Sequence, residues 1–256
     1  MPNDRLGIVA EFGEQVMASI ISRFTAFSPL TPDDLEDLAR LATGRRSLRR
    51  GEAISRQGEP SPGLFLVLRG WVASSAIFAN GATQLVNIYL TGDMVGTTDL
   101  ALRRCAQSAV ALTPVELSVI SRHEVGLLFE RSPRLAALLF LISQEERVTL
   151  MDRLAAVGAT RAPNSLASLL LHLHTRVMRS DPEPSGSFIM PLSQDQVAAL
   201  IGVTPVHLNR TLQQLRQEGL VEWTRHRVTI LDRPGLIAMS GLPKRELDLE
   251  AAWLPE

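Results

Sequence analysis

The sequence predicts an α+β protein in which a β roll, a long helix and a small helical domain with a strand hairpin follow one another. Three observations predict this. Short apolar runs separated by glycine turns fill residues 51–121, and a long apolar helical pattern covers 133–157. Residues 192–219 then carry two short amphipathic helices joined at a glycine. The 256 residues suggest one or two domains, at about 150 residues per domain.

Composition excludes several classes of protein. The 26 basic and 27 acidic residues nearly cancel, so no bulk charge selects for nucleic acid or membrane. The single cysteine, Cys105, excludes an intramolecular disulfide and a four-cysteine iron–sulfur cluster. No apolar run reaches the ~18–20 residues of a membrane span, and the N-terminus lacks a signal-peptide pattern, so we expect a cytoplasmic protein without a membrane partner.

The first thirty residues predict an amphipathic lead-in helix, with Phe12, Val16, Ile20 and Phe24 spaced by four. A second helix begins after Thr31, which can cap it with Pro32 in the first turn. The domain boundaries we expect are 1–30 for the lead-in, 31–130 for the roll, 131–159 for the long helix, 160–235 for the helical domain and 236–256 for a tail.

The glycine-rich region predicts a small β sandwich or barrel, because many short strands at nearly even spacing alternate with turn signals. Asn80-Gly81 is the strongest short hairpin signal. The main predicted strands are 64–68, 71–78, 85–90 and 115–120.

The helix predicted over 133–157 has more apolar residues than one side of a surface helix needs. It is either buried in a core or packed against its copy in a dimer. The residues alone leave both interpretations open.

The segment 192–219 predicts a helix-turn-helix. Ser193 and Gln196 form a capping box, and Gly202 can end the first helix in the left-handed conformation. Thr204 caps the second helix, with Pro205 at its first position. The buried stripe of this second helix is Leu208, Leu212 and Leu215.

The outward face of the second helix predicts DNA binding. At about 100° per residue, Val206, Arg210 and Gln213 lie opposite the buried stripe. Arginine, asparagine and glutamine pair with guanine and adenine edges in the major groove. A basic hairpin tip then follows as a wing that can touch the sugar–phosphate backbone. The candidate DNA-binding residues are Thr204, Val206, His207, Asn209, Arg210, Gln213, Gln214, Arg225, His226 and Arg227.

Four stretches give the chain a resemblance to the bacterial Crp/Fnr regulators: GEAISRQGE (51–59), LFLVLRGWV (64–72), GATQLVNIYLTGDMVG (81–96) and the helix-turn-helix. The resemblance covers roughly residues 25–233. It implies a double-stranded jelly roll of the cyclic-nucleotide-binding type, a long dimerisation helix over 133–157 and a winged helix-turn-helix. It also implies a homodimer that binds an inverted-repeat operator in double-stranded DNA and controls transcription by contacting RNA polymerase or by blocking it.

The resemblance places a candidate effector pocket at Gly96, Thr97, Thr98, Gln107 and Ser108. In nucleotide-binding members a glutamate stands where Thr97 does, and a phosphate-binding arginine where Gln107 does. Losing that arginine removes the strongest polar contact with the phosphate. We therefore do not expect the protein to bind cyclic AMP or cyclic GMP.

Other cofactors of the family are not expected either. The oxygen-sensing members hold an iron–sulfur cluster with N-terminal cysteines, and no cysteine precedes Cys105. Haem-binding members need a histidine near Thr97, and no histidine precedes His123. His172 and His174 are two positions apart on a predicted helix and cannot share one metal ion. Arg103 and Arg104 would lower the pKa of Cys105 if they act on it; the alternative is an inert thiol.

In the recognition helix, Arg210 matches the family's guanine reader, whereas Val206 replaces a glutamate. The half-site is therefore expected to differ from the commonest family consensus. No catalytic motif is present, so no enzyme is expected. Two alternative functions remain at this point. One is a receptor gated by a cyclic nucleotide in an unusual phosphate pocket, and the other is an interaction protein that no longer binds DNA.

Overall fold

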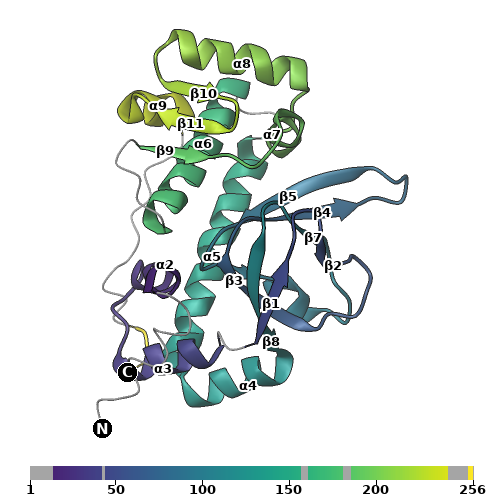
Figure 1. The fold of residues 1–256 in the computed structure, drawn as a ribbon, viewed down its shortest axis with the longest axis vertical. Coiled ribbons are helices and arrows are strands. Elements are labelled where there is room, and N and C mark those ends of the chain that lie inside the picture. The colour runs from purple at the N-terminus through teal and green to yellow at the C-terminus, as the bar shows by residue number, and fades with distance from the viewer. Residues whose placement is uncertain (1–13, 42–43, 157–160, 181–185, 242–252, 256) are drawn as a thin grey trace. The chain divides into compact units, whose positions relative to one another are not determined.

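The computed structural model describes residues 14–41, 44–156, 161–180, 186–241 and 253–255 (Figure 1). The chain divides into two compact units, which are described separately. The first comprises Met1–Glu145 with Leu247–Glu256, and the second comprises Glu146–Glu246.

The first unit contains the predicted β roll. The strands β3 (Gly63–Arg69), β4 (Val72–Ile77), β5 (Thr83–Tyr89) and β8 (Val115–Ser121) confirm the four predicted runs within two residues at each end. Four further strands, of two to four residues each, were not predicted because they are too short to show alternation. They are β1 (Arg45–Leu48), β2 (Ala53–Ser55), β6 (Met94–Val95) and β7 (Ser108–Ala111).

The strands form two antiparallel sheets that face each other, with strand orders β1-β8-β3-β6 and β2-β7-β4-β5. Every neighbouring strand is distant in the sequence except β4 and β5, which is the pattern of a jelly roll. A buried apolar cluster fills the space between the sheets. Its largest members are Leu48, Ile54, Phe65, Val67, Val72, Val95, Val115 and Leu117.

The β4–β5 hairpin confirms the Asn80-Gly81 turn signal. Phe78 N donates to Ala82 O at 2.9 Å, and Asn80 Oδ1 accepts from Ala82 N at 3.0 Å. Gly81 has a φ of 81°, a left-handed conformation that favours glycine.

The helices of the first unit pack on β3 and its neighbours and form a second buried cluster. They are α2 (Glu14–Thr25), α3 (Pro32–Leu41), α4 (Arg122–Arg131) and the first part of α5 (Pro133–Ala156). Ile20 and Phe24 on α2 are fully buried in this cluster. The predicted lead-in helix is therefore an integral part of the first unit, and a boundary at residue 30 does not separate it. Phe12 lies outside the described residues.

Helix α5 shows why its apolar pattern has two interpretations. Leu135, Leu138 and Ile142 are buried in the core of the first unit. Phe140 and Leu154, in contrast, have 55% and 75% of their surface exposed. The helix therefore supplies a core stripe and also carries exposed apolar residues.

The second unit confirms the predicted winged helix-turn-helix. It contains α6 (Ala162–Ser180), β9 (Ser187–Ile189), α7 (Gln194–Ile201), α8 (Pro205–Gln217), β10 (Val221–Thr224), β11 (Arg227–Ile230) and α9 (Arg233–Ser240). The strands form one sheet in the order β10-β11-β9, and α6 contacts α7, α8 and α9 (Figure 1). Helix α9 extends this unit beyond the boundary expected at residue 235.

The described end of the chain belongs to the first unit. Leu254 is buried in the helical cluster, and Arg134 Nη1 donates to Pro255 O at 3.2 Å. Part of the expected tail thus packs on the roll's helices, while 242–252 lie outside the described residues. Among the helices that are described, none is long and apolar enough to cross a membrane.

Candidate DNA-binding surface and effector loop

The helix-turn-helix is built by local capping. Gln196 N donates to Ser193 Oγ at 3.2 Å, and Ser193 N donates to Gln196 Oε1 at 2.9 Å, which completes the predicted capping box of α7. Gly202 ends α7 with a φ of 73°. Its left-handed conformation lets the chain turn at once into the second helix.

Helix α8 begins as predicted. Thr204 Oγ1 accepts a hydrogen bond from His207 N at 3.2 Å, and Pro205 occupies the first turn. Leu208, Leu212 and Leu215 are buried. The Thr204 hydroxyl, a predicted DNA-binding group, therefore caps α8 in this structure.

Thr211 is an additional buried residue of α8 that the sequence analysis did not name. Its Oγ1 donates to His207 O at 2.9 Å, one turn back along the helix. Its position, three residues after Leu208 and four before Leu215, could have predicted its burial from the sequence.

The outward face of α8 is exposed and borders a hollow. A hollow of about 380 Å³ lies along its N-terminal half. It is lined by Pro163, Thr204, Val206, His207, Arg210, Thr211 and Gln214. The structure therefore brings five of the predicted residues together and adds Pro163 from α6 and Thr211. Gln213 is exposed outside this lining.

Two predicted amides on α8 already have intrahelical partners. Asn209 Nδ2 donates to Pro205 O at 3.1 Å, and Gln214 Nε2 donates to Glu218 Oε1 at 2.9 Å. The oxygen and the second N–H of each amide can still pair with a base edge. Arg210 and Val206 lie on the same exposed face of the helix.

The wing is a tight hairpin. Thr224 pairs with Arg227, so Arg225 and His226 form the two-residue turn between β10 and β11. Arg225 has a φ of 55°, and its carbonyl accepts from Trp223 Nε1 at 3.2 Å. Both turn side chains are exposed. The tip therefore presents an arginine and a histidine to solvent.

Arg227 differs from the two turn residues. Its Nη1 donates to Ser187 Oγ on β9 at 2.6 Å. This bond ties the wing to the neighbouring strand, so Arg227 has a structural role within the sheet.

The expected effector loop contains a short helix, η1 (Thr97–Ala101), capped by Gly96 at a φ of 90°. Thr97 is half-buried, and Thr98 is exposed. Asp99 is buried, and its Oδ1 accepts from Ala106 N at 2.8 Å across the loop. Arg122 donates to the carbonyls of Asp99 and Leu100, which closes the same loop from the other side.

Ser108 lies on the outer face of its sheet, because Ala109 and Ala111 on β7 point into the core. Its Oγ accepts from Gln57 N at 3.0 Å. It lines a shallow hollow of about 420 Å³ together with residues of β2 and β4, whereas Gly96, Thr97, Thr98 and Gln107 do not. Of the five expected pocket residues, this hollow therefore holds only Ser108.

The arginines beside Cys105 do not activate it. Arg104 Nη1 donates to Gly58 O at 2.7 Å. The thiol is buried, and this burial, followed by the negative charge of Asp99, raises the pKa of Cys105 above its ordinary value. The thiol form is therefore favoured at neutral pH, in keeping with the inert alternative.

His174 is a buried histidine of α6. Its Nε2 lies 3.1 Å from Gly186 O, and its ring contacts the Phe188 ring edge-on at 6.2 Å. Burial, assisted by the positive charge of Arg233, lowers the pKa of His174. His172 instead contacts Arg176 at 3.2 Å. Within the described residues, no group of three or more His, Cys, Asp or Glu side chains is arranged to hold a metal.

Comparisons with known proteins agree with this architecture. Residues 45–132 match the cyclic nucleotide-binding domain, and residues 165–239 match the Crp-like helix-turn-helix domain. The transcriptional regulatory protein btr of Bordetella pertussis is 26% identical over 209 residues, which cover 82% of this chain and 86% of btr. The transcriptional activator protein anr of Pseudomonas aeruginosa is 24% identical over 212 residues, covering 83% and 86%.

Solved structures show the same fold. FixK2 from Bradyrhizobium japonicum superposes with a TM-score of 0.69 at 20% identity, covering 78% of this chain and 98% of that chain. A Crp/Fnr-family regulator from Thermus thermophilus, TTHA1359, superposes with a TM-score of 0.61 at 21% identity, covering 77% and 97%. The predicted fold class is confirmed.

Both domain matches and the named relatives therefore lead to one assignment. Regulators of this family bind DNA through the helix-turn-helix and are generally dimeric, and the family is not enzymatic. The chain belongs to the Crp/Fnr family of transcription regulators and carries the family's helix-turn-helix DNA-binding domain.

Proposed function

We propose that the protein is a homodimeric, sequence-specific reader of an inverted-repeat operator, with α8 in the major groove and no requirement for a cyclic nucleotide. The observation that carries this proposal is the exposed face of α8, where Arg210 stands beside Val206 over the hollow. Arginine pairs bidentately with guanine O6 and N7. The wing tip at Arg225 adds a phosphate contact.

The exposed apolar residues of α5 support a dimer. Phe140 and Leu154 are fourteen residues apart, which is two heptads, with the exposed Arg147 at the heptad position between them; Met151 lies one turn before Leu154. A parallel partner helix would cover these apolar side chains and remove them from water. A dimer also supplies the two recognition helices that an inverted repeat needs.

The effector loop supports independence from cyclic nucleotides. A cyclic phosphate would need a cation, yet Arg104 and Arg122 donate hydrogen bonds to backbone carbonyls. The buried carboxylate of Asp99 lies in the same loop, close to Gly96. A side chain built on Gly96 would place its Cβ 3.6 Å from Asp99 Oδ2. A phosphate at this place would face a negative charge without the expected arginine.

The experiment is selection of duplexes from a random pool by the ligand-free protein at near-physiological salt, followed by sequencing. We expect an inverted repeat with half-sites a whole number of helical turns apart. Parallel selections with cyclic AMP and cyclic GMP provide the comparison. A motif recovered only with a nucleotide would show a gated receptor. No motif in any arm would overturn ligand-free operator binding, and would mean either that another effector is required or that DNA is not the partner. Sedimentation of the protein with and without the selected duplex tests the dimer.

A further inference from the structure

Val206 stands out among the apolar residues of the winged domain. Its side chain is 65% exposed at the start of α8, more than Ile189, Leu231 or Ile237 in the same unit. A β-branched residue at an exposed helical position adds little to helix stability. Single exposed apolar residues are common on protein surfaces. Val206 differs because it lines the hollow of the recognition face together with Arg210.

The distance between Val206 and Arg210 along α8 can be compared with the spacing of base pairs in DNA. They are four residues apart on one helix, so they lie on the same face with a rise of about 6 Å between them. Base pairs in B-DNA are about 3.4 Å apart. If Arg210 contacts a guanine, Val206 therefore lies within about two base pairs of it.

The polar groups around Val206 are partly occupied within the helix. Thr204 Oγ1 caps His207 N, and Asn209 Nδ2 donates to Pro205 O. The two methyl groups of Val206 have no polar function. At its own position on the face, Val206 therefore presents only apolar atoms to the base edges.

The major groove offers one apolar group for such a surface, the C5 methyl of thymine. Valine cannot hydrogen-bond to the amino group of cytosine or to guanine O6, and covering either would remove water without replacing its hydrogen bond. Contact with Val206 therefore favours thymine and disfavours the other bases.

We propose that Val206 is a specificity residue that reads the 5-methyl group of a thymine within two base pairs of the guanine bound by Arg210. The inference rests on the proposed function, in which α8 enters the major groove. It adds the identity of one base, and the atom of that base, to the operator half-site.

The test uses the duplex recovered by selection. Each thymine of the half-site is replaced in turn by uracil, which removes only the methyl group, and binding is measured by fluorescence anisotropy. We expect one position at which uracil weakens binding about fourfold per half-site, the effect of one buried methyl group. At the other positions uracil should leave the affinity unchanged.

Three variants connect that position to Val206. Val206→Ala should bind the thymine and uracil duplexes equally, because the contacting methyl groups are gone. Ile189→Ala, an exposed apolar residue on β9, is the matched control and should keep the full difference. Val206→Glu should shift the preference of that position, since glutamate accepts from the amino group of cytosine.

The outcomes separate this inference from the proposed function. Selective binding with no uracil-sensitive position, or uracil sensitivity that persists in Val206→Ala, overturns the role of Val206 and leaves the operator reader intact. Failure to select any duplex overturns the proposed function and this inference with it.

Discussion

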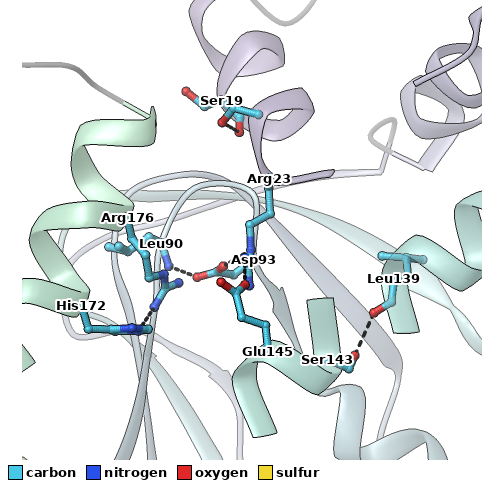
Figure 2. A network of polar contacts seen from close by, with 10 residues as sticks. Ser19, Arg23, Leu90, Asp93, Leu139, Ser143, Glu145, His172 and Arg176 are labelled. Carbon is cyan, nitrogen blue, oxygen red and sulfur yellow. Dashed lines mark hydrogen bonds and ion pairs between the residues drawn. The ribbon is translucent and has the colours of Figure 1, made fainter. Parts of the chain in front are cut away.

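Arg23 Nε lies 3.3 Å from Asp93 Oδ1, and the two side chains are only 7% and 1% exposed. Arg23 belongs to α2, and Asp93 belongs to the turn between β5 and β6, where its other oxygen accepts from Leu90 N at 2.6 Å. Arg23 also forms an ion pair with Glu145 on α5, and Figure 2 shows the three side chains pointing toward one another. This cluster joins the N-terminal helix, the roll and α5 within the first unit.

Removing one member of the Arg23–Asp93 pair should strongly destabilise the first unit. Arg23→Ala leaves the carboxylate of Asp93 buried without its cation, which costs about 3–5 kcal/mol. Urea denaturation of the full chain measures the loss. Arg40→Ala is the matched control, because Arg40 pairs with Glu36 at the surface, where such a pair contributes about 0–1 kcal/mol. Equal losses in the two variants would contradict the structural role of the buried pair.

Arg210→Ala should weaken binding to the selected duplex by about 1–3 kcal/mol and relax the choice of base at one position. The reason is the loss of a bidentate contact with one guanine. Competition binding with single-base variants of the duplex measures both effects. Arg50→Ala, an exposed arginine of the first unit, removes the same charge and should leave the base preference unchanged. Uniform weakening across all duplexes would make Arg210 a phosphate contact.

Arg225→Asn should weaken binding to every duplex by a similar factor. Asparagine accepts the left-handed conformation at this position, where φ is 55°, so the turn is retained while the charge is lost. The dependence of log K on log salt should become less steep by about one for each wing. A change of base preference, with an unchanged salt dependence, would refute the phosphate contact.

Acidification should destabilise the second unit through His174. Burial lowers its pKa below the ordinary value of 6.5, so the unfolded chain binds the proton more readily than the folded chain. The contribution to stability is therefore present above about pH 6.5 and is lost as the pH falls toward the lowered pKa of the folded state.

Hydrogen exchange of the α6 and β9 amides at pH 7 and pH 5.5 measures this loss. His174→Gln should reduce the difference between the two pH values. His123→Gln, at an exposed histidine of the first unit, serves as the control and should keep the wild-type difference. An unchanged pH difference in His174→Gln would assign the acid sensitivity to other groups.

The helix-turn-helix could be predicted almost completely because its signals are local. Ser193, Gly202 and Thr204 each act on backbone groups within a few residues, so their spacing specifies where α7 ends and α8 begins. The longer strands and the Asn80-Gly81 hairpin were predictable for the same reason. Periodicity and turn chemistry act over stretches of about five to ten residues.

The tertiary structure decided which partner each of several polar side chains contacts. Arg23 and Asp93 are seventy positions apart, and only the packing of α2 on the roll brings them together. Arg227 donates to Ser187 on β9, forty positions away, a contact that the hairpin pattern alone did not indicate. Ser108 was expected in one pocket with Gly96, but the alternation of β7 turns its side chain to the outer face. None of these partners could be inferred from neighbouring residues.

Helix α5 shows the division most clearly. The sequence by itself determined that a long apolar helix follows the roll, because the periodicity of apolar residues depends only on helical geometry. Only the tertiary structure decided that Leu135, Leu138 and Ile142 enter the core while Phe140 and Leu154 stay exposed. The sequence shows which residues are apolar and are stabilised by leaving water. Which surface covers each of them depends on contacts between segments that are far apart in the chain.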